Sequence, residues 1–112
     1  MSSSINFPEE FLAILQQEGV SLQSEGVNDI ALPLNTALRA IAILRTSRVA
    51  TIGGEVWERV GDRFKPTYDG WTNEREDRIG ESEYIDSSLN AAEKVVAFYS
   101  SRGGDFYIAF GI

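Results

Sequence analysis

The 112-residue sequence contains no histidine and no cysteine. Histidine is the commonest general base and metal ligand in proteins, and cysteine shares most zinc sites with it. A Ser–His–Asp triad, a Cys–His pair and an ordinary zinc centre are therefore excluded, and we expect neither a metal nor a cofactor. Without cysteine the fold has no disulfide framework and depends on its apolar core. This usage fits a cytoplasmic protein.

Long apolar runs and excess positive charge are also missing. No stretch approaches the roughly 20 apolar residues of a membrane-spanning helix, and the N-terminus lacks the basic and apolar segments of a secretion signal. We therefore expect no membrane association. The net charge is −7, with 17 acidic and 10 basic residues. Such a charge argues against a nucleic-acid partner, which requires clustered Lys and Arg, and suits a positively charged protein.

The residues that are present suffice for one folded domain, which we place at 1–112. Hydrophobic residues make up 43% of the chain and aromatic residues 11%, enough for a real core. Apolar residues recur at helical spacing over 8–18, 34–46 and 82–101, and 19–32 is expected to be a connector. The apolar stripe of the second helix is predicted to consist of Leu34, Leu38, Ile41 and Leu44, with Ala37 and Ala40 allowing close packing.

The period changes between the second and third helices. Residues 49–68 are rich in β-branched and aromatic residues, and Gly61 and Asp62 provide turn chemistry. This pattern predicts a β-hairpin that pairs 55–60 with 63–68.

Two further segments complete the predicted sheet. Residues 49–52 either continue the first strand through a kink at Gly53 and Gly54 or pair separately, and adjacent glycines indicate a bulge or a close backbone approach. The apolar run near 105–111 predicts a last strand that is buried on both faces or paired centrally. We therefore expect an α+β fold, in which a small, mostly antiparallel sheet (the hairpin near 49–68 plus the C-terminal strand) packs against three helices.

The segment KPTYDGWTNERED, residues 65–77, combines loop residues with large aromatics and clustered carboxylates. We predict an irregular loop here because Pro66 and Gly70 break regular structure. Trp71, surrounded by small polar residues and carboxylates, is typical of an apolar anchor inside a charged rim, as in a protein-binding hot spot. For Trp57 a place in the core stays open as an alternative. The candidate protein-binding residues are Trp57, Tyr68, Asp69, Trp71, Glu74, Glu76 and Asp77.

Two other functions remain open at this level. One is a carboxylate-dependent enzyme acting on a small or sugar-like substrate, because paired carboxylates are the only catalytic material left. The other is a structural or oligomer-forming module that uses the final strand as an edge. Neither an EF-hand nor a phosphate-binding glycine motif is present. The carboxylates available for the enzyme alternative are Glu74, Glu76, Asp77, Glu81 and Glu83.

The most particular pattern of the sequence lies in its middle. It runs from GVNDIAL into an Ala/Leu/Ile-rich helix, then through VATIGGEVWERVGDRFKPTYDGW to an acidic helix start. Over roughly 25–100 this order resembles the immunity protein 40 family of bacterial polymorphic toxin systems. The features that carry the resemblance are Gly53-Gly54, Trp57, the turn at Gly61 and KPTYDGW at 65–71.

The resemblance implies a cytoplasmic protein that binds and neutralises a cognate toxin domain, usually encoded beside it, without a cofactor or a reaction. Matching positions suggest Tyr68, Asp69 and Trp71 as recurring residues of the family, in the service of either binding or folding. Many toxins of this kind are nucleases with basic substrate clefts, which an acidic inhibitor could cover. The N-terminal helix and the closing strand lie outside the part that carries the resemblance.

Overall fold

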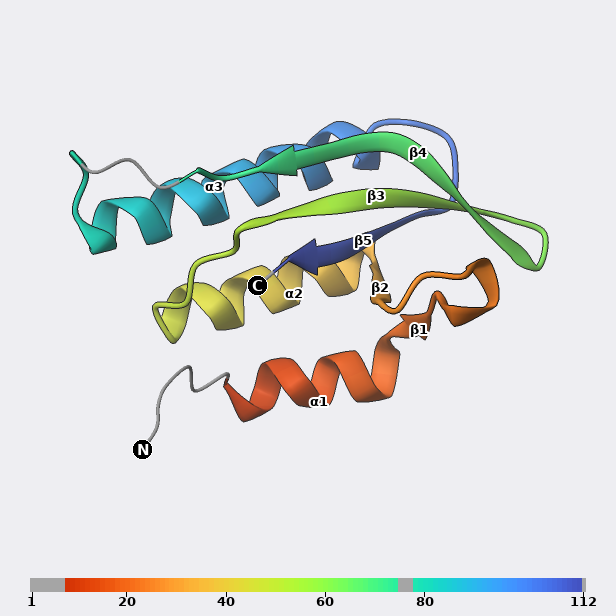
Figure 1. The fold of residues 1–112 in the computed structure, drawn as a ribbon, viewed down its shortest axis with the longest axis horizontal. Helices are drawn as coiled ribbons and strands as arrows, with labels where there is room; N and C mark the ends of the chain where they lie inside the picture. Colours follow the sequence, from red (N-terminus) through yellow and green to blue (C-terminus); the bar gives the residue numbers. More distant parts are fainter. Residues whose placement is uncertain (1–7, 75–77, 112) are drawn as a thin grey trace.

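The computed structural model describes residues 8–74 and 78–111 and confirms the α+β class (Figure 1). Within these residues, three α-helices accompany a five-stranded sheet, and none of the helices has both the length and the apolarity that crossing a bilayer requires. In chain order the elements are α1 (Glu9–Glu18), β1 (Val20–Ser21), the 3-10 turn η1 (Gln23–Glu25), β2 (Ile30–Pro33), α2 (Leu34–Thr46), β3 (Gly53–Val60), β4 (Arg63–Thr72), α3 (Glu81–Ser100) and β5 (Phe106–Gly111).

The last strand forms the centre of the sheet. The strand order is β1-β2-β5-β3-β4, and all neighbouring pairs are antiparallel. Ile108 of β5 lies opposite Leu32 of β2 on one side and Val56 of β3 on the other. The prediction of a centrally paired last strand is confirmed. An oligomer-forming module with this strand as its edge is contradicted, because β1 and β4 are the edges.

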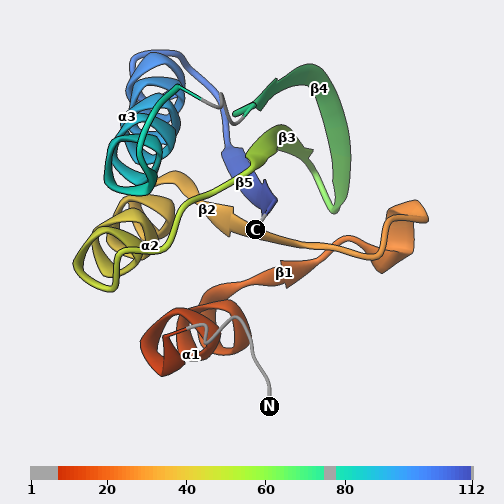
Figure 2. The same cartoon turned by 60° about the vertical axis from the view of Figure 1, so that its left-hand side comes forward.

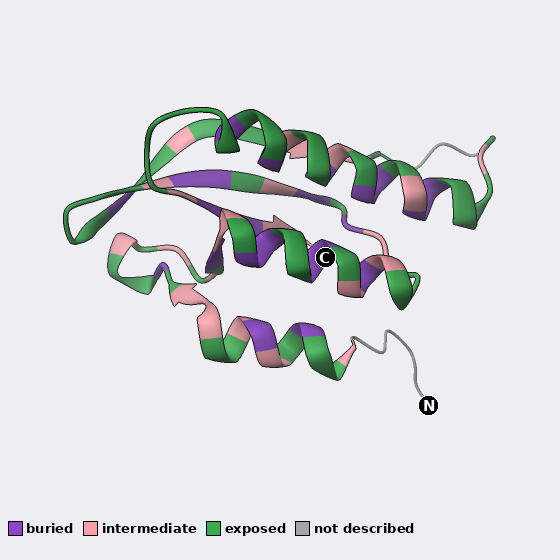
Figure 3. Cartoon of the chain, turned by 180° about the vertical axis from the view of Figure 1, so that it is seen from behind, coloured by how far each residue is buried: buried purple, intermediate pink, exposed green. Residues whose placement is uncertain are grey.

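All three helices lie on one face of the sheet (Figure 2). Buried residues recur along them at helical spacing (Figure 3), and Leu89 and Val96 of α3 meet Ile108 and Val56 of the sheet in the main core. Burying a side chain of this size stabilises the fold by about 1.5–3 kcal/mol. The buried residues of this core are Phe11, Ile14, Leu32, Ala37, Ala40, Ile41, Leu44, Val56, Ile85, Leu89, Ala92, Val96, Tyr99 and Ile108.

The predicted place of Leu38 in the core is wrong. Its side chain is 46% exposed, whereas Ala37, Ala40 and Ile41 are completely buried. Successive helix residues are rotated by about 100°, so a buried face centred on the two alanines leaves Leu38 to one side. The bounds predicted for α2 are otherwise confirmed.

The predicted connector at 19–32 is also wrong, because it contains β1, η1 and β2. These strands have two and four residues, too few to show an alternating pattern. Their conformation follows from pairing with each other and with β5. Leu22 and Ala31 from this segment pack with Trp57 and Tyr107 in a second, smaller core on the face of the sheet away from the helices.

An ion pair joins η1 to the hairpin on this second face. The Arg63 guanidinium donates two hydrogen bonds to the Glu25 carboxylate, at 2.9 and 2.8 Å, and the backbone N–H of Phe64 donates a third at 3.2 Å. These donors, Arg63 first, lower the pKa of Glu25 to about 2.

The hairpin is longer than predicted, and 49–52 form no strand. The Thr51 N–H bonds the Ser88 hydroxyl of α3 instead of a neighbouring strand. Gly53 and Gly54 belong to β3, and the close backbone approach predicted for them is confirmed. At Gly53, with a φ of 147°, an added Cβ would lie 2.1 Å from the Trp71 carbonyl oxygen.

Candidate binding site

The segment predicted as a loop is an edge strand with a large bulge. Glu55 of β3 lies opposite Gly70 of β4, and Trp57 lies opposite Pro66. One β3 residue between these pairs therefore faces three β4 residues, Thr67–Asp69 by position in the sequence. The loop prediction for 65–72 is wrong. Its breakers, Pro66 and Gly70, flank the bulge because an edge strand tolerates both.

Tyr68 is at the centre of the bulge. Its φ is 64°, in the left-handed region, and the residue is 93% exposed. A non-glycine residue in such a conformation costs about 1–3 kcal/mol and persists only where the surroundings impose it. The bulge thus directs an aromatic ring into solvent at the expense of folding stability.

Hydrogen bonds fix the bulge on both sides of Tyr68. The Thr67 hydroxyl donates to the Val56 carbonyl at 2.8 Å and accepts the Asp69 N–H at 3.1 Å. The Tyr99 hydroxyl, from α3, donates to the Asp69 carboxylate. Burial and the neighbouring Asp69 carboxylate raise the pKa of Tyr99, so it remains a donor. The bulge is thereby tied to the helix layer beneath it.

Two hollows, of about 380 and 400 Å³, flank this part of β4, and Glu55 and Gly70 line both of them. Glu55 and Trp57 point to the face away from the helices, because they alternate with the buried Val56. We call the surface formed by Glu55, Tyr68, Asp69, Gly70 and the two hollows the bulge face.

The bulge face carries only one sign of charge. Asp29 and Glu55 line the 400 Å³ hollow, Glu55 and Asp69 the 380 Å³ hollow, and none of the described residues lining either hollow is Lys or Arg. Within the described part of the chain these three carboxylates form no ion pair. Their charge is available to a molecule outside the chain.

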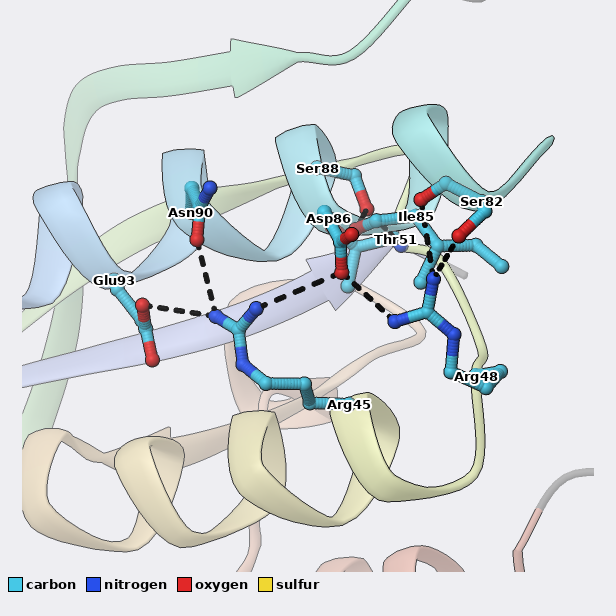
Figure 4. A network of polar contacts seen from close by, with 9 residues as sticks. All are labelled: Arg45, Arg48, Thr51, Ser82, Ile85, Asp86, Ser88, Asn90 and Glu93. Atoms are coloured by element: carbon cyan, nitrogen blue, oxygen red, sulfur yellow. Dashed lines mark hydrogen bonds and ion pairs between the residues drawn. The ribbon is translucent and has the colours of Figure 1, made fainter. Parts of the chain in front are cut away.

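The helix layer shows the opposite arrangement (Figure 4). Arg45 contacts Glu93 at 2.9 Å, and Arg48 contacts Asp86 at 2.7 Å. The Arg48 guanidinium, supported by Arg45, lowers the pKa of Asp86.

The arginines of the hairpin also have acidic partners within the chain. Arg59 faces Asp105, and Arg63 faces Glu25. The described arginines with acidic partners therefore neutralise carboxylates away from the bulge face.

The structure buries one of the two predicted tryptophans, Trp57, and leaves the other, Trp71, partly exposed. Trp57 is 5% exposed and belongs to the second core, as the alternative for this residue held. Trp71 is partly buried on the helix side. Its ring packs edge-on against the Phe110 ring, with 6.5 Å between the two ring centres. A Cβ added to Gly54 would lie 2.5 Å from the Trp71 Cη2 atom. Tyr68 is the most exposed aromatic residue at this site, and Trp71 lines the 400 Å³ hollow.

The remaining predicted residues divide between the two ends of the region. Tyr68 and Asp69 meet at the bulge, whereas the exposed Glu74 follows the end of β4 and lines neither hollow. Glu76 and Asp77 lie outside the described residues. Glu55 and Asp29 were missed by sequence reasoning. The alternation of side chains along a strand, counted from Trp57, could have identified Glu55. Asp29 could not be identified, because the sequence did not predict the strand β2 that follows it.

The carboxylates proposed for an enzyme are not gathered at a site in the described residues. Glu74, Glu81 and Glu83 are exposed and line neither hollow of the bulge face. Among residues 8–74 and 78–111, no group of three or more His, Cys, Asp or Glu side chains is arranged to hold a metal ion.

The sequence matches the model of one known protein family. The model of a family described as immunity protein 40 matches residues 21–112. The match covers the bulge and, beyond the range expected from sequence, the central strand β5. Neither a curated protein nor a solved structure matches the chain.

Proposed function

This chain belongs to the immunity protein 40 family, and we propose that it binds and neutralises a cognate bacterial toxin domain through the bulge face. The family description makes it an immunity protein. The toxin is the partner that such a protein must recognise. In this proposal it acts by covering a surface of the toxin, with no reaction of its own.

The observation that carries the proposal is the conformation of Tyr68. A ring that is 93% exposed gains little from contacts within the chain, yet its backbone has a φ of 64°. Tyrosine is enriched among residues that dominate binding energy. A backbone already held in its bound conformation also loses less conformational entropy on binding. A tyrosine with a strained backbone, held by bonds to Thr67 and Asp69, and with an exposed ring therefore supports a preformed anchor for a protein partner.

The carboxylates of the bulge face extend the proposal to the charge of the toxin. Asp29, Glu55 and Asp69 lack ion-pair partners among the described residues, and the chain as a whole carries a net charge of −7. Unpaired negative charge around an aromatic anchor speeds the encounter with a basic surface and favours it over an acidic one. We propose a basic toxin surface, such as the substrate cleft of a nuclease, and an encounter in the cytoplasm.

The test combines the cognate toxin domain with two variants of this protein. Tyr68→Ala should lower the affinity at least about 30-fold, the loss expected for a hot spot of about 2 kcal/mol. Calorimetry on the purified pair measures the affinity, and growth of cells producing both proteins measures protection. Leu38→Ala is the matched control, because Leu38 is also a large exposed side chain but lies on α2. Equal affinities for Tyr68→Ala and Leu38→Ala would refute the proposed surface.

A further inference from the structure

We infer that the 380 Å³ hollow beside Tyr68 receives an arginine side chain of the toxin, with the Glu55 carboxylate as its acceptor and the Tyr68 ring as its stacking surface. The inference rests on the proposed function and specifies the chemistry of the partner. It goes beyond a general attraction of charges, because it assigns one side-chain type to one hollow.

The lining of the hollow matches a planar cation. Trp57, Pro66 and Tyr68 supply apolar and aromatic walls, and Glu55 and Asp69 supply the charge. One Asp69 oxygen already accepts the Tyr99 hydroxyl, so Glu55 is the carboxylate with both oxygens available among the described contacts. No basic residue is among the described residues lining the hollow. The charge must therefore be balanced from outside the chain or by solvent.

The indole of Trp57 is an independent sign that a ligand belongs here. Trp57 is 5% exposed and lines the hollow, and its Nε1–H has no hydrogen-bond partner among the described residues. A buried donor without an acceptor costs about 1–3 kcal/mol. The Nε1 atom is closed to solvent in the unbound chain, so a main-chain carbonyl oxygen of the inserted segment accepts from it once insertion displaces the wall of the hollow.

Arginine fits the hollow better than lysine because of its shape. A guanidinium donates two parallel hydrogen bonds to one carboxylate and stacks on an aromatic ring, whereas an ammonium is a compact, strongly hydrated charge. Elsewhere the protein itself contains both interactions, a doubly hydrogen-bonded arginine–carboxylate pair and an arginine stacked on an aromatic ring. Arg63 bonds both oxygens of Glu25 at 2.8 and 2.9 Å, and the guanidinium carbon of Arg102 lies 4.7 Å from the centre of the Phe98 ring.

The experiment uses the full chain labelled with 15N and two small probes, N-acetyl-arginine amide and N-acetyl-lysine amide. We expect the arginine probe to give saturable NMR shifts at the backbone amides of Glu55 and Gly70 and at the Trp57 indole N–H. The lysine probe should bind more weakly by about fivefold, the size of one charge-assisted contact near the surface. Glu55→Gln should weaken the arginine probe by about the same factor.

Glu10→Gln is the matched control, since it removes the same charge from an exposed position on α1. It should leave binding of the arginine probe unchanged. Absent or non-saturating shifts, equal binding of the two probes, or equal losses in Glu55→Gln and Glu10→Gln would each overturn the inference. If any of these occurs while Tyr68→Ala still weakens the toxin complex, the arginine assignment fails and the proposed function stands.

Discussion

Arg48 and Tyr68 have nearly the same backbone conformation and opposite surroundings. Within residues 8–74 and 78–111 they are the two non-glycine residues with positive φ, 56° and 64°. The Arg48 side chain bonds Asp86 at 2.7 Å and both the hydroxyl and the carbonyl oxygen of Ser82, at 2.7 and 3.1 Å (Figure 4). The Tyr68 side chain extends into solvent.

The difference shows where a strained conformation is compensated. At Arg48 the cost is offset within the chain, because the turn after α2 brings the guanidinium to α3. At Tyr68 the described hydrogen bonds hold the neighbouring residues, Thr67 and Asp69. The Tyr68 ring itself makes no comparable stabilising contact among the described residues. Backbone strain that the residue's own side chain does not offset is characteristic of functional positions. Tyr68 is therefore the anchor in the proposed function.

A large effect is expected from loss of the hydrogen bond that holds Asp69, the residue after Tyr68. Tyr99→Phe removes the hydroxyl that holds Asp69. It should lower the free energy of unfolding by about 1.5–3 kcal/mol, the range for a hydrogen bond to a charged group. It should also weaken the toxin complex by about tenfold, because a looser bulge must be ordered on binding. Urea unfolding and calorimetric titration measure the two quantities.

A second tyrosine of α3 is the control for this variant. The Tyr84 hydroxyl donates to the Asn73 carbonyl at 2.7 Å, past the end of β4. Tyr84→Phe should lower the free energy of unfolding by about 0.5–1.5 kcal/mol, since its acceptor is a neutral carbonyl, and should leave the toxin affinity unchanged. If both variants weaken the complex equally, Tyr99 has only a structural role.

A pH-dependent effect is expected for a carboxylate with a partner inside the chain, Glu25. Arg63 and the Phe64 N–H lower the pKa of Glu25 from 4.5 to about 2. Because the folded pKa is the lower one, the stability from this ion pair is complete above about pH 4.5 and is lost as the pH falls towards 2. Glu25→Gln should therefore flatten the decline of the unfolding free energy across this window. A Glu25 carboxyl that titrates near 4.5 by NMR would contradict the ion pair.

The sequence predicted the helices and the central strand because their patterns are long enough to read. Leu89, Val96 and Ile108 lie in runs of clear helical or apolar character, and Pro33 marks the start of α2. It did not predict β1 and β2, whose few residues are ordered by tertiary pairing.

The candidate site was only partly predictable for the same reason. Composition identifies Tyr68, Asp69 and Trp71, and the structure adds that Trp71 is partly buried against Phe110 whereas Tyr68 extends into solvent. The left-handed φ of Tyr68 depends on Thr67, on Asp69 and on Tyr99, which lies 30 residues after Asp69. Contacts of that range leave no local pattern.

In the proposed function Tyr68 is held in a costly conformation for contact outside the chain, and the unfolding free energy of Tyr68→Gly tests this role most directly. We predict that Tyr68→Gly is more stable than the native protein by about 0.5–1 kcal/mol, since glycine tolerates positive φ. The same change at Arg48 should give no gain, and Gly61→Ala, at a φ of 65° in open space, should lose about 1 kcal/mol. A Tyr68→Gly variant that is less stable than the native protein would show that Tyr68 serves the fold and would contradict the account.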